Sequence, residues 1–166
     1  MSYLVIVDLT LPKKVEERFR LMAEAQGLPI EAIIAEAVVR RIGDPEVEVE
    51  LHLKLCEKFL LEGQELLMKG DYLEASEKHW GAVAQAVKAV AAKQGLELKT
   101  HGQLWDFVNK LVEKLKDLEL GDSWIRANAL HKNFYEGKLI PELAKKYMED
   151  ARNLVEKLKK LINNDQ

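Results

Sequence analysis

Helix starts and stops recur at short intervals from Asp44 onward, and this punctuation restricts the fold more than any other feature of the chain. The signals are Asp44-Pro45, Gly70-Asp71, Gly95, Thr100 with Gln103, Gly121-Asp122-Ser123, Gly137 and Pro141. Each is a residue type that caps, opens or ends a helix. Between them, apolar residues recur every three or four positions. The segment 44–166 is therefore predicted to be an all-α, up-and-down bundle of five helices joined by short connections.

The first 43 residues follow a different pattern. Residues 3–10 (YLVIVDLT) are mostly β-branched and apolar, which predicts a strand. Two short helices are expected next, over Lys13–Gln26 and from Pro29 to Gly43. A lone strand needs a partner for its backbone groups, and the simplest partner is the same strand of a second molecule. Residues 1–43 are thus predicted to form a strand-helix-helix dimerisation arm in front of the bundle.

The charge balance argues against a broadly basic nucleic-acid-binding protein. The chain of 166 residues carries 25 Lys and Arg against 28 Asp and Glu. Residues 1–43 have six of each sign, and the remainder has 19 basic against 22 acidic residues. Nonspecific binding to nucleic acid depends on neutralising phosphates, so it requires a basic excess that neither part has. A local basic patch remains compatible with these numbers.

Compartment and cofactor signals are few. A single cysteine, Cys56, allows no internal disulfide, and no apolar run approaches the ~18 residues of a membrane span. The N-terminus has no secretion pattern, so we expect a cytoplasmic protein that does not bind membranes. No metal-ligand spacing or phosphate-binding glycine loop occurs, and no cofactor or metal is expected. The 39 Lys and Glu against 12 Asn and Gln lean toward a heat-adapted organism.

The order strand, Leu-Pro, helix, Gly27-Leu28-Pro29 and helix resembles a ribbon-helix-helix unit. The resemblance covers about the first 43 residues and implies two chains that pair their strands. That family reads DNA through outward-facing ribbon side chains, which here would be Ile6, Asp8 and Thr10. An acid and an isoleucine are poor partners for phosphates and base edges. A dimerisation device is therefore preferred over a DNA-binding transcriptional regulator.

Three phrases carry a second resemblance: KGDYLEASEKHWGAVAQAVKAVAAKQG at 69–95, HGQLWDFVNKL at 101–111 and ANALHKNFYEG at 127–137. Together they resemble the archaeal PaREP family, a group of helical proteins related to the HEPN superfamily, over about residues 44–162. The resemblance implies a small intracellular protein that dimerises through its helices. It brings no established activity with it.

The HEPN relationship implies a protein that handles nucleic acid or nucleotides, with RNA or a nucleotide as its partner, and a specific catalytic hypothesis follows from it. Ribonucleases of that superfamily carry an Arg, four to six residues, and a His, and Arg126 and His131 satisfy this spacing. A His can move a proton from the ribose 2′-hydroxyl, and an Arg can hold the phosphate without a metal. Asn128 would orient the two. Residues five apart on a helix point about 140° from each other, so two copies would complete the site across a dimer axis. Ala127 stands where active members often have a polar residue.

Two other functions stay open beside a metal-independent RNA endonuclease. One is a non-catalytic interaction module that would act as the partner of a separate nucleotidyltransferase, and the other is the ribbon-helix-helix regulator. Among the remaining histidines, His79 is expected in the core and His52 in solvent, while His101 is expected to be exposed or to line the same cleft. Trp80, Trp105 and Trp124 are interpreted as packing residues.

Overall fold

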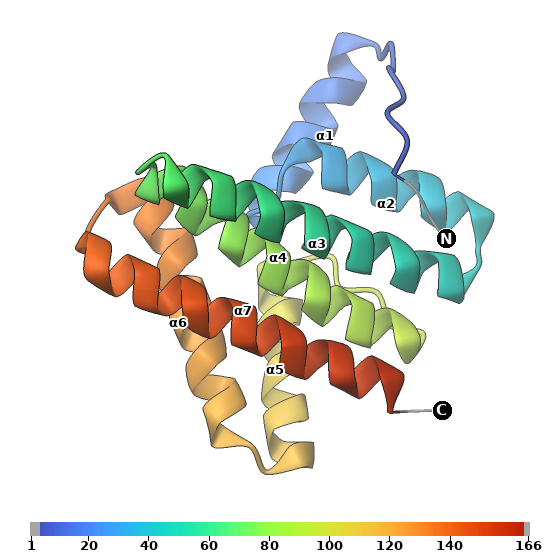
Figure 1. The fold of residues 1–166 in the computed structure, drawn as a ribbon. Helices are drawn as coiled ribbons and strands as arrows, with labels where there is room; N and C mark the ends of the chain where they lie inside the picture. The colour runs from blue at the N-terminus through green and yellow to red at the C-terminus, as the bar shows by residue number, and fades with distance from the viewer. Residues whose placement is uncertain (1–3, 165–166) are drawn as a thin grey trace.

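The computed structural model describes residues 4–164, and within them it contains seven helices and no strand (Figure 1). The helices are α1 (Lys13–Gln26), α2 (Ile30–Ile42), α3 (Pro45–Met68), α4 (Tyr72–Lys93), α5 (His101–Leu115), α6 (Leu118–Glu136) and α7 (Pro141–Asn163). The protein is all-α, as expected. The prediction of a five-helix up-and-down bundle preceded by a strand is wrong.

The N-terminal strand is the first error. Residues 4–10 form no strand, and Tyr3 lies outside the described residues. Every regular element in the described part of the chain is a helix, so no sheet edge exists within the molecule for this segment to pair with. Its apolar side chains are also not packed inward, because Val7 is 71% and Leu9 is 56% exposed. β-branched composition alone does not make a strand without a partner edge.

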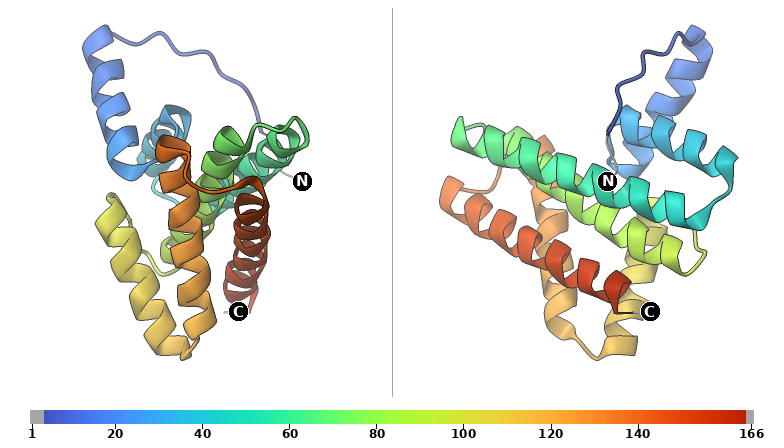
Figure 2. Two further views of the ribbon diagram at one scale, coloured as in Figure 1. Left: turned by 90° about the vertical axis from the view of Figure 1, so that its left-hand side faces the viewer. Right: turned by 45° about the vertical axis from the view of Figure 1, so that its right-hand side comes forward.

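The up-and-down arrangement is the second error. Helices α3, α4 and α7 run side by side as one layer, whereas α5 and α6 cross that layer steeply (Figures 1 and 2). Helix α4 packs against α3, α6 and α7. Its small residues let neighbours approach closely from several directions, since the alanines at 82, 84, 86, 89 and 91 are all fully buried. Short connections alone therefore do not make neighbouring helices antiparallel.

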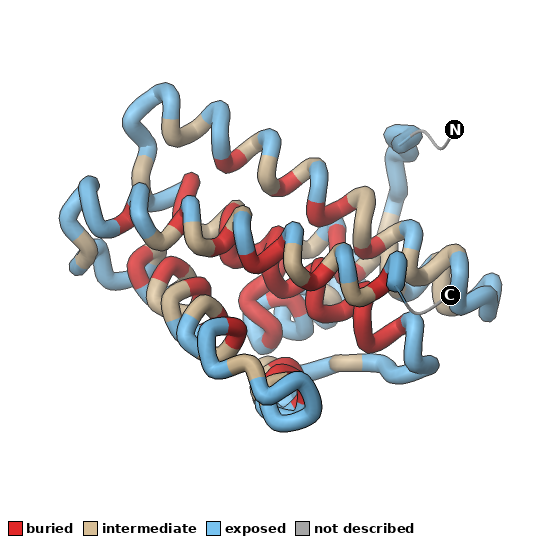
Figure 3. The backbone as a smooth tube through the Cα atoms, turned by 60° about the horizontal axis from the view of Figure 1, so that its bottom comes forward, coloured by how far each residue is buried: buried red, intermediate tan, exposed pale blue. Residues whose placement is uncertain are grey.

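Helix α4 forms the centre of the core. It is buried along nearly its whole length from Ala75 to Ala92, and buried residues are concentrated around it (Figure 3). The largest fully buried side chains come from α4 and its neighbours, and they include Phe59, Trp80, Trp124, Leu104, Leu130 and Met148. The prediction that Trp80 and Trp124 are packing residues is confirmed by their burial.

Most of the helix starts read from the sequence are present. The side chains of Asp44, Asp71 and Thr100 each accept a hydrogen bond from a backbone N–H in the first turn of the next helix. The start of α6 is an exception. Its cap is Asp117, which accepts from the Leu120 N–H, rather than the Gly121-Asp122-Ser123 group. Gly121 instead lies inside the helix, where an added Cβ would lie 3.4 Å from Val112.

Helices α1 and α2 form a hairpin in which α2 packs against α3, while α1 stands away from the other helices along most of its length (Figure 2). Gly27 joins them in the left-handed conformation, with φ of 67°, and its N–H closes the end of α1. None of the described helices is both long enough and apolar enough to cross a membrane. The joint at Gly27 positions the hairpin over the site described next.

Candidate functional site

His131 on α6 and Glu77 on α4 form a hydrogen-bonded pair. His131 Nδ1 donates to Glu77 Oε2 over 2.8 Å, and both side chains are about four-fifths buried. Burial raises the pKa of Glu77, and the hydrogen bond from His131 opposes that shift. With the proton on Nδ1, the other ring nitrogen, Nε2, carries a free lone pair. This is the arrangement in which a carboxylate orients an imidazole for proton transfer.

Aromatic rings enclose the imidazole of His131. The Trp80 indole stacks on it with centroids 5.2 Å apart and planes inclined by 29°, and Tyr135 meets it edge-on at 5.3 Å. Tyr135 is 66% exposed, so it forms the outer side of this group. Burial raises the pKa of the Tyr135 phenol, and the carboxylates of Glu77 and Glu24 add to the shift. The phenol is therefore a hydrogen-bond donor near neutral pH.

A second imidazole stands beside the first. The ring of His101, the first residue of α5, lies with its centroid 6.0 Å from that of His131. Its Nε2 donates to Asn128 Oδ1 over 2.8 Å, and Asn128 Nδ2 donates to the Trp124 carbonyl over 2.9 Å. The second bond fixes which end of the amide faces His101. We call His131, Glu77, His101, Asn128 and Trp80 the two-histidine site.

Arg126 is not part of this site within one chain. Its guanidinium contacts Glu119 over 3.2 Å and Asp150 on α7 over 3.5 Å. The five-residue spacing turns Arg126 away from His131 around α6, as the helical geometry predicts. The structure thus brings together two of the three predicted site residues, His131 and Asn128, and Asn128 orients His101 rather than the predicted pair.

The joint between α1 and α2 closes the remaining edge of His131. A Cβ added to Gly27 would lie 2.6 Å from His131 Cε1 and 2.7 Å from Nε2, so the glycine backbone packs directly on that edge. The Gly27 carbonyl also accepts a hydrogen bond of 3.0 Å from Trp80 Nε1. A residue with a side chain has no room here, and the left-handed backbone favours glycine as well.

An open cavity of about 280 Å³ adjoins the two-histidine site. Glu77, Tyr135 and Gly27 line it together with apolar side chains that include Phe59 and Phe134. The carboxylates of Glu24 and Glu74 lie at the same cavity, and Arg20 there is paired with Glu16. The space beside Glu77 therefore joins an apolar wall to charged groups.

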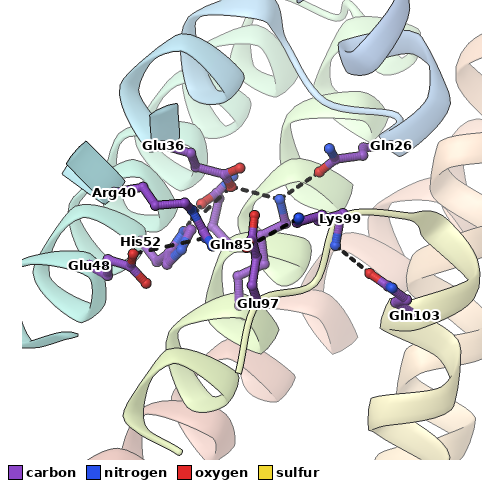
Figure 4. Close-up of polar contacts among 10 residues, drawn as sticks. Gln26, Glu36, Arg40, Glu48, His52, Gln85, Glu97, Lys99 and Gln103 are labelled. Carbon is purple, nitrogen blue, oxygen red and sulfur yellow. Dashed lines mark hydrogen bonds and ion pairs between the residues drawn. The ribbon is translucent and has the colours of Figure 1, made fainter. Parts of the chain in front are cut away.

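A second buried polar group lies farther along α4 (Figure 4). Lys88, which is 3% exposed, donates to Gln26 at the end of α1 and to Glu36 on α2, each over 2.6 Å. Burial lowers the pKa of Lys88, and the Glu36 carboxylate opposes that shift. We call Lys88, Glu36 and Gln26 the Lys88 clasp.

His52 belongs to the same region, and its predicted solvent exposure is wrong. It is 4% exposed, and its Nδ1 donates to Gln85 Oε1 over 2.7 Å. Burial lowers its pKa to about 4. Helix α2 packs over α3 at His52, so this residue belongs to the buried face of α3. His79 is fully buried as expected, with a pKa of about 4 for the same reason.

His79 and Cys56 have structural environments. His79 Nδ1 donates to the Ala75 carbonyl, which leaves Nε2 to accept from Arg152 over 3.1 Å. Burial raises the pKa of the Cys56 thiol to about 12, so it is no nucleophile. Across residues 4–164, no cluster of three or more His, Cys, Asp or Glu side chains is arranged to hold a metal ion.

Sequence reasoning missed Glu77 and Lys88. A signal for both was present, because Glu77, Trp80, Ala84 and Lys88 recur at the spacing of one helical stripe. Two opposite charges on the same helix face as a buried tryptophan indicate that another part of the chain packs over that face. The first two helices cover this face, whereas the sequence pattern predicts them as a dimerisation arm in front of the bundle.

Comparison with known proteins adds the family. The model of the archaeal PaREP1/PaREP8 family matches residues 51–155, which include Glu77, His101, Asn128 and His131. A crystal structure of a protein from Sulfolobus solfataricus is similar at a TM-score of 0.58 and 28% identity, covering 64% of this chain and 95% of that one. A search of the curated proteins finds no match. The family match spans well over half of the sequence, and the chain belongs to the archaeal PaREP1/PaREP8 family.

Proposed function

We propose that the two-histidine site catalyses metal-independent cleavage of RNA, with His131 as the general base. The observation that carries this proposal is the 2.8 Å bond from His131 Nδ1 to Glu77, which leaves Nε2 as the proton acceptor. The second imidazole, His101, supplies the other group that acid–base cleavage needs. The HEPN resemblance points to the same chemistry at His131.

The reaction uses both rings. His131 Nε2 takes the proton of the ribose 2′-hydroxyl, whose oxygen attacks the phosphorus. The bond from phosphorus to the 5′-oxygen breaks, and protonated His101, held at Nε2 by Asn128, gives that oxygen a proton through Nδ1. The products are a 2′,3′-cyclic phosphate and a 5′-hydroxyl end. Each proton transfer by a positioned group contributes about 10²–10⁴-fold to the rate.

Two features of the site suit single-stranded RNA. The exposed ring of Tyr135 offers a face on which an unpaired base can stack, and such stacking is worth about 1–3 kcal/mol per base. Arg126 points away from His131, so in this proposal it binds phosphate only if it comes from a second copy of the chain. The single-chain chemistry therefore rests on the imidazoles and Glu77.

The test is cleavage of end-labelled single-stranded RNA in EDTA by the wild type and by His131→Asn, His101→Asn and Glu77→Gln. Lys132→Ala is the matched control, because Lys132 is exposed on the same helix beside His131. We expect roughly 100-fold losses for the histidine variants, a smaller loss for Glu77→Gln and none for the control. Equal cleavage by all five proteins, or a product without a cyclic phosphate, would contradict the proposal.

A second candidate function is a homodimeric interaction module. Among the described residues, half of the large apolar side chains that are exposed lie within residues 4–42. They are Leu4, Val5, Ile6, Val7, Leu9, Val15, Leu21, Met22, Val38 and Ile42. A concentration of exposed apolar side chains marks an interaction surface, and a second copy brings an identical apolar set to cover it.

Light scattering after size exclusion tests the dimer. Ile6→Asp combined with Val7→Asp should give a monomer, because a charge at the contact opposes burial of the apolar surface. Leu118→Asp is the control, since Leu118 is 79% exposed outside this region. A wild-type monomer at all concentrations would refute the dimer.

A further inference from the structure

Both ring nitrogens of His131 have close neighbours in this structure, although the side chain keeps 18% of its surface exposed. Nδ1 is bonded to Glu77, and the backbone of Gly27 lies against Cε1 and Nε2. The Trp80 indole N–H, on the same face, is bonded to the Gly27 carbonyl. A substrate atom that approaches Nε2 along this edge of the ring would meet the joint between α1 and α2.

The apolar contacts that hold the α1–α2 hairpin in place are few. Helix α1 buries only Ala23 and Gln26, and α2 buries only Ala32 and Ile33. The joint adds Leu28, which is 6% exposed. An element with so little buried apolar surface opens at a lower free energy than a core helix such as α4.

The specific attachment is the Lys88 clasp. The Lys88 ammonium is nearly inaccessible to solvent, and both of its hydrogen-bonding partners come from the hairpin, Gln26 from α1 and Glu36 from α2. Arg40 also reaches from α2 to Glu48 on α3 and to Glu97 beyond α4 (Figure 4). Lys88 lies on the same face of α4 as Trp80 and Glu77, nearer the C-terminal end of the helix. Polar contacts thus hold the hairpin over the site beside an apolar patch of Ala23, Leu28, Ala32 and Ile33, against which Phe19 and Ile30 pack in part.

We infer that the α1–α2 hairpin is an opening cover over His131, closed by the Lys88 clasp and seated at Gly27. In the closed form it excludes substrate from Nε2. In the open form it exposes Nε2, the face of Trp80 and the side of Glu77 that faces the hairpin. The inference rests on the proposed role of His131, but access to the ring can be measured without cleavage.

Glu36→Gln is the sharpest perturbation. It leaves the shape of the side chain and removes the charge that compensates buried Lys88. Breaking one half of a buried ion pair destabilises its contact strongly, because the other charge stays buried without compensation. When the hairpin opens, Lys88 returns to water, so the penalty falls on the closed form. We expect the open fraction to rise at least about 30-fold.

Glu31→Gln is the matched control. Glu31 lies on the same helix and its carboxylate bonds to Lys58 on α3 over 2.9 Å, yet its side chain is about half exposed. Such surface pairs contribute about 0–1 kcal/mol, so this variant should change opening by less than about fivefold. A third variant, Lys88→Met combined with Glu36→Gln, removes both charges and should return opening toward the wild-type level.

The readouts are the rate at which diethyl pyrocarbonate modifies His131, followed by mass spectrometry, and amide hydrogen exchange. Glu36→Gln should speed modification of His131 and exchange within residues 13–42, while exchange in α4 and α7 stays unchanged. Equal rates in Glu36→Gln and Glu31→Gln would overturn the inference, and so would faster exchange throughout the molecule. If His131 becomes accessible and RNA is still not cleaved, the cover stands and the proposed ribonuclease activity falls.

Discussion

The close approach of Gly27 to His131 predicts the effect of a single added methyl group. In Gly27→Ala the new Cβ would lie 2.6 Å from His131 Cε1, well inside contact distance. Overpacking of this kind typically costs about 1–3 kcal/mol. The positive φ of 67° adds about 1 kcal/mol for a residue with a side chain. The sum for a hairpin that stays seated is about 2–4 kcal/mol.

Gly43→Ala separates the two contributions. Gly43 also ends a helix with a positive φ, 74°, but no atom lies within 4 Å of its added Cβ. It therefore carries the backbone cost alone, about 1 kcal/mol. The difference between the two variants measures the contact with His131.

Urea denaturation followed by circular dichroism gives the free energy of unfolding of both variants, and of Gly27→Ala combined with His131→Ala. Removing the ring makes room for the methyl group, so the double variant should recover about 1–3 kcal/mol of interaction energy in a double-mutant cycle. Gly27→Ala alone should also speed amide hydrogen exchange in α1 and α2. If Gly27→Ala costs no more than Gly43→Ala, the joint does not press on His131 and the reasoning fails.

Three further predictions follow from buried and capping groups. His52 and His79 have folded pKa values of about 4, below their usual 6.5, so the unfolded state binds more protons between these values and stability should fall as pH drops from about 6.5 to 4. Each contributes up to about 1.4 kcal/mol per pH unit, and urea midpoints at pH 7, 6 and 5 should decline, with a shallower decline in His79→Gln. Cys56, with a pKa of about 12, should resist Ellman's reagent in the folded protein and react only after denaturation; rapid labelling of the native protein would contradict its burial. Asp117→Ala should cost about 1 kcal/mol through loss of the α6 cap, and Asp122→Ala close to nothing, whereas the reverse order in thermal melts would place the start of α6 at Gly121.

The helices were predictable where a local signal decides the outcome. Asp44, Asp71 and Thr100 cap helices as expected, because a side-chain oxygen three residues or fewer from a free N–H satisfies it regardless of what packs nearby. Asp117 was not predicted as a cap because it directly follows the end of α5 at Lys116. The turn-forming residues at 121–123 were predicted to start α6 instead. Both Asp117 and the residues at 121–123 have the chemistry of a helix cap, so the local sequence did not decide between them.

What local signals could not give was the packing partner. Residues 4–10 have strand composition, yet pairing depends on an edge elsewhere in space. The HEPN resemblance implied Arg126, Asn128 and His131 as site residues, but Glu77 lies 54 positions from His131 in sequence and His101 is linked to Asn128 across 27. The burial of His52 depends likewise on contact between α2 and α3. Which residues meet across helices is decided by tertiary packing, which single-residue patterns do not encode.

The central position of Lys88 has a practical consequence for work on the family-matched helices alone. A chain shortened to begin at Asp44 would keep the ammonium of Lys88 but lose the Glu36 carboxylate and the Gln26 amide that accept from it. It would also leave the Trp80 N–H without the Gly27 carbonyl and uncover apolar α3 and α4 surface. The flexible side chain of Lys88 could reach water, whereas the Trp80 indole and its neighbours would form an exposed apolar surface that favours self-association. Shortened forms therefore need polar replacements at the uncovered α3–α4 surface before their solution behaviour can be compared with that of the whole protein.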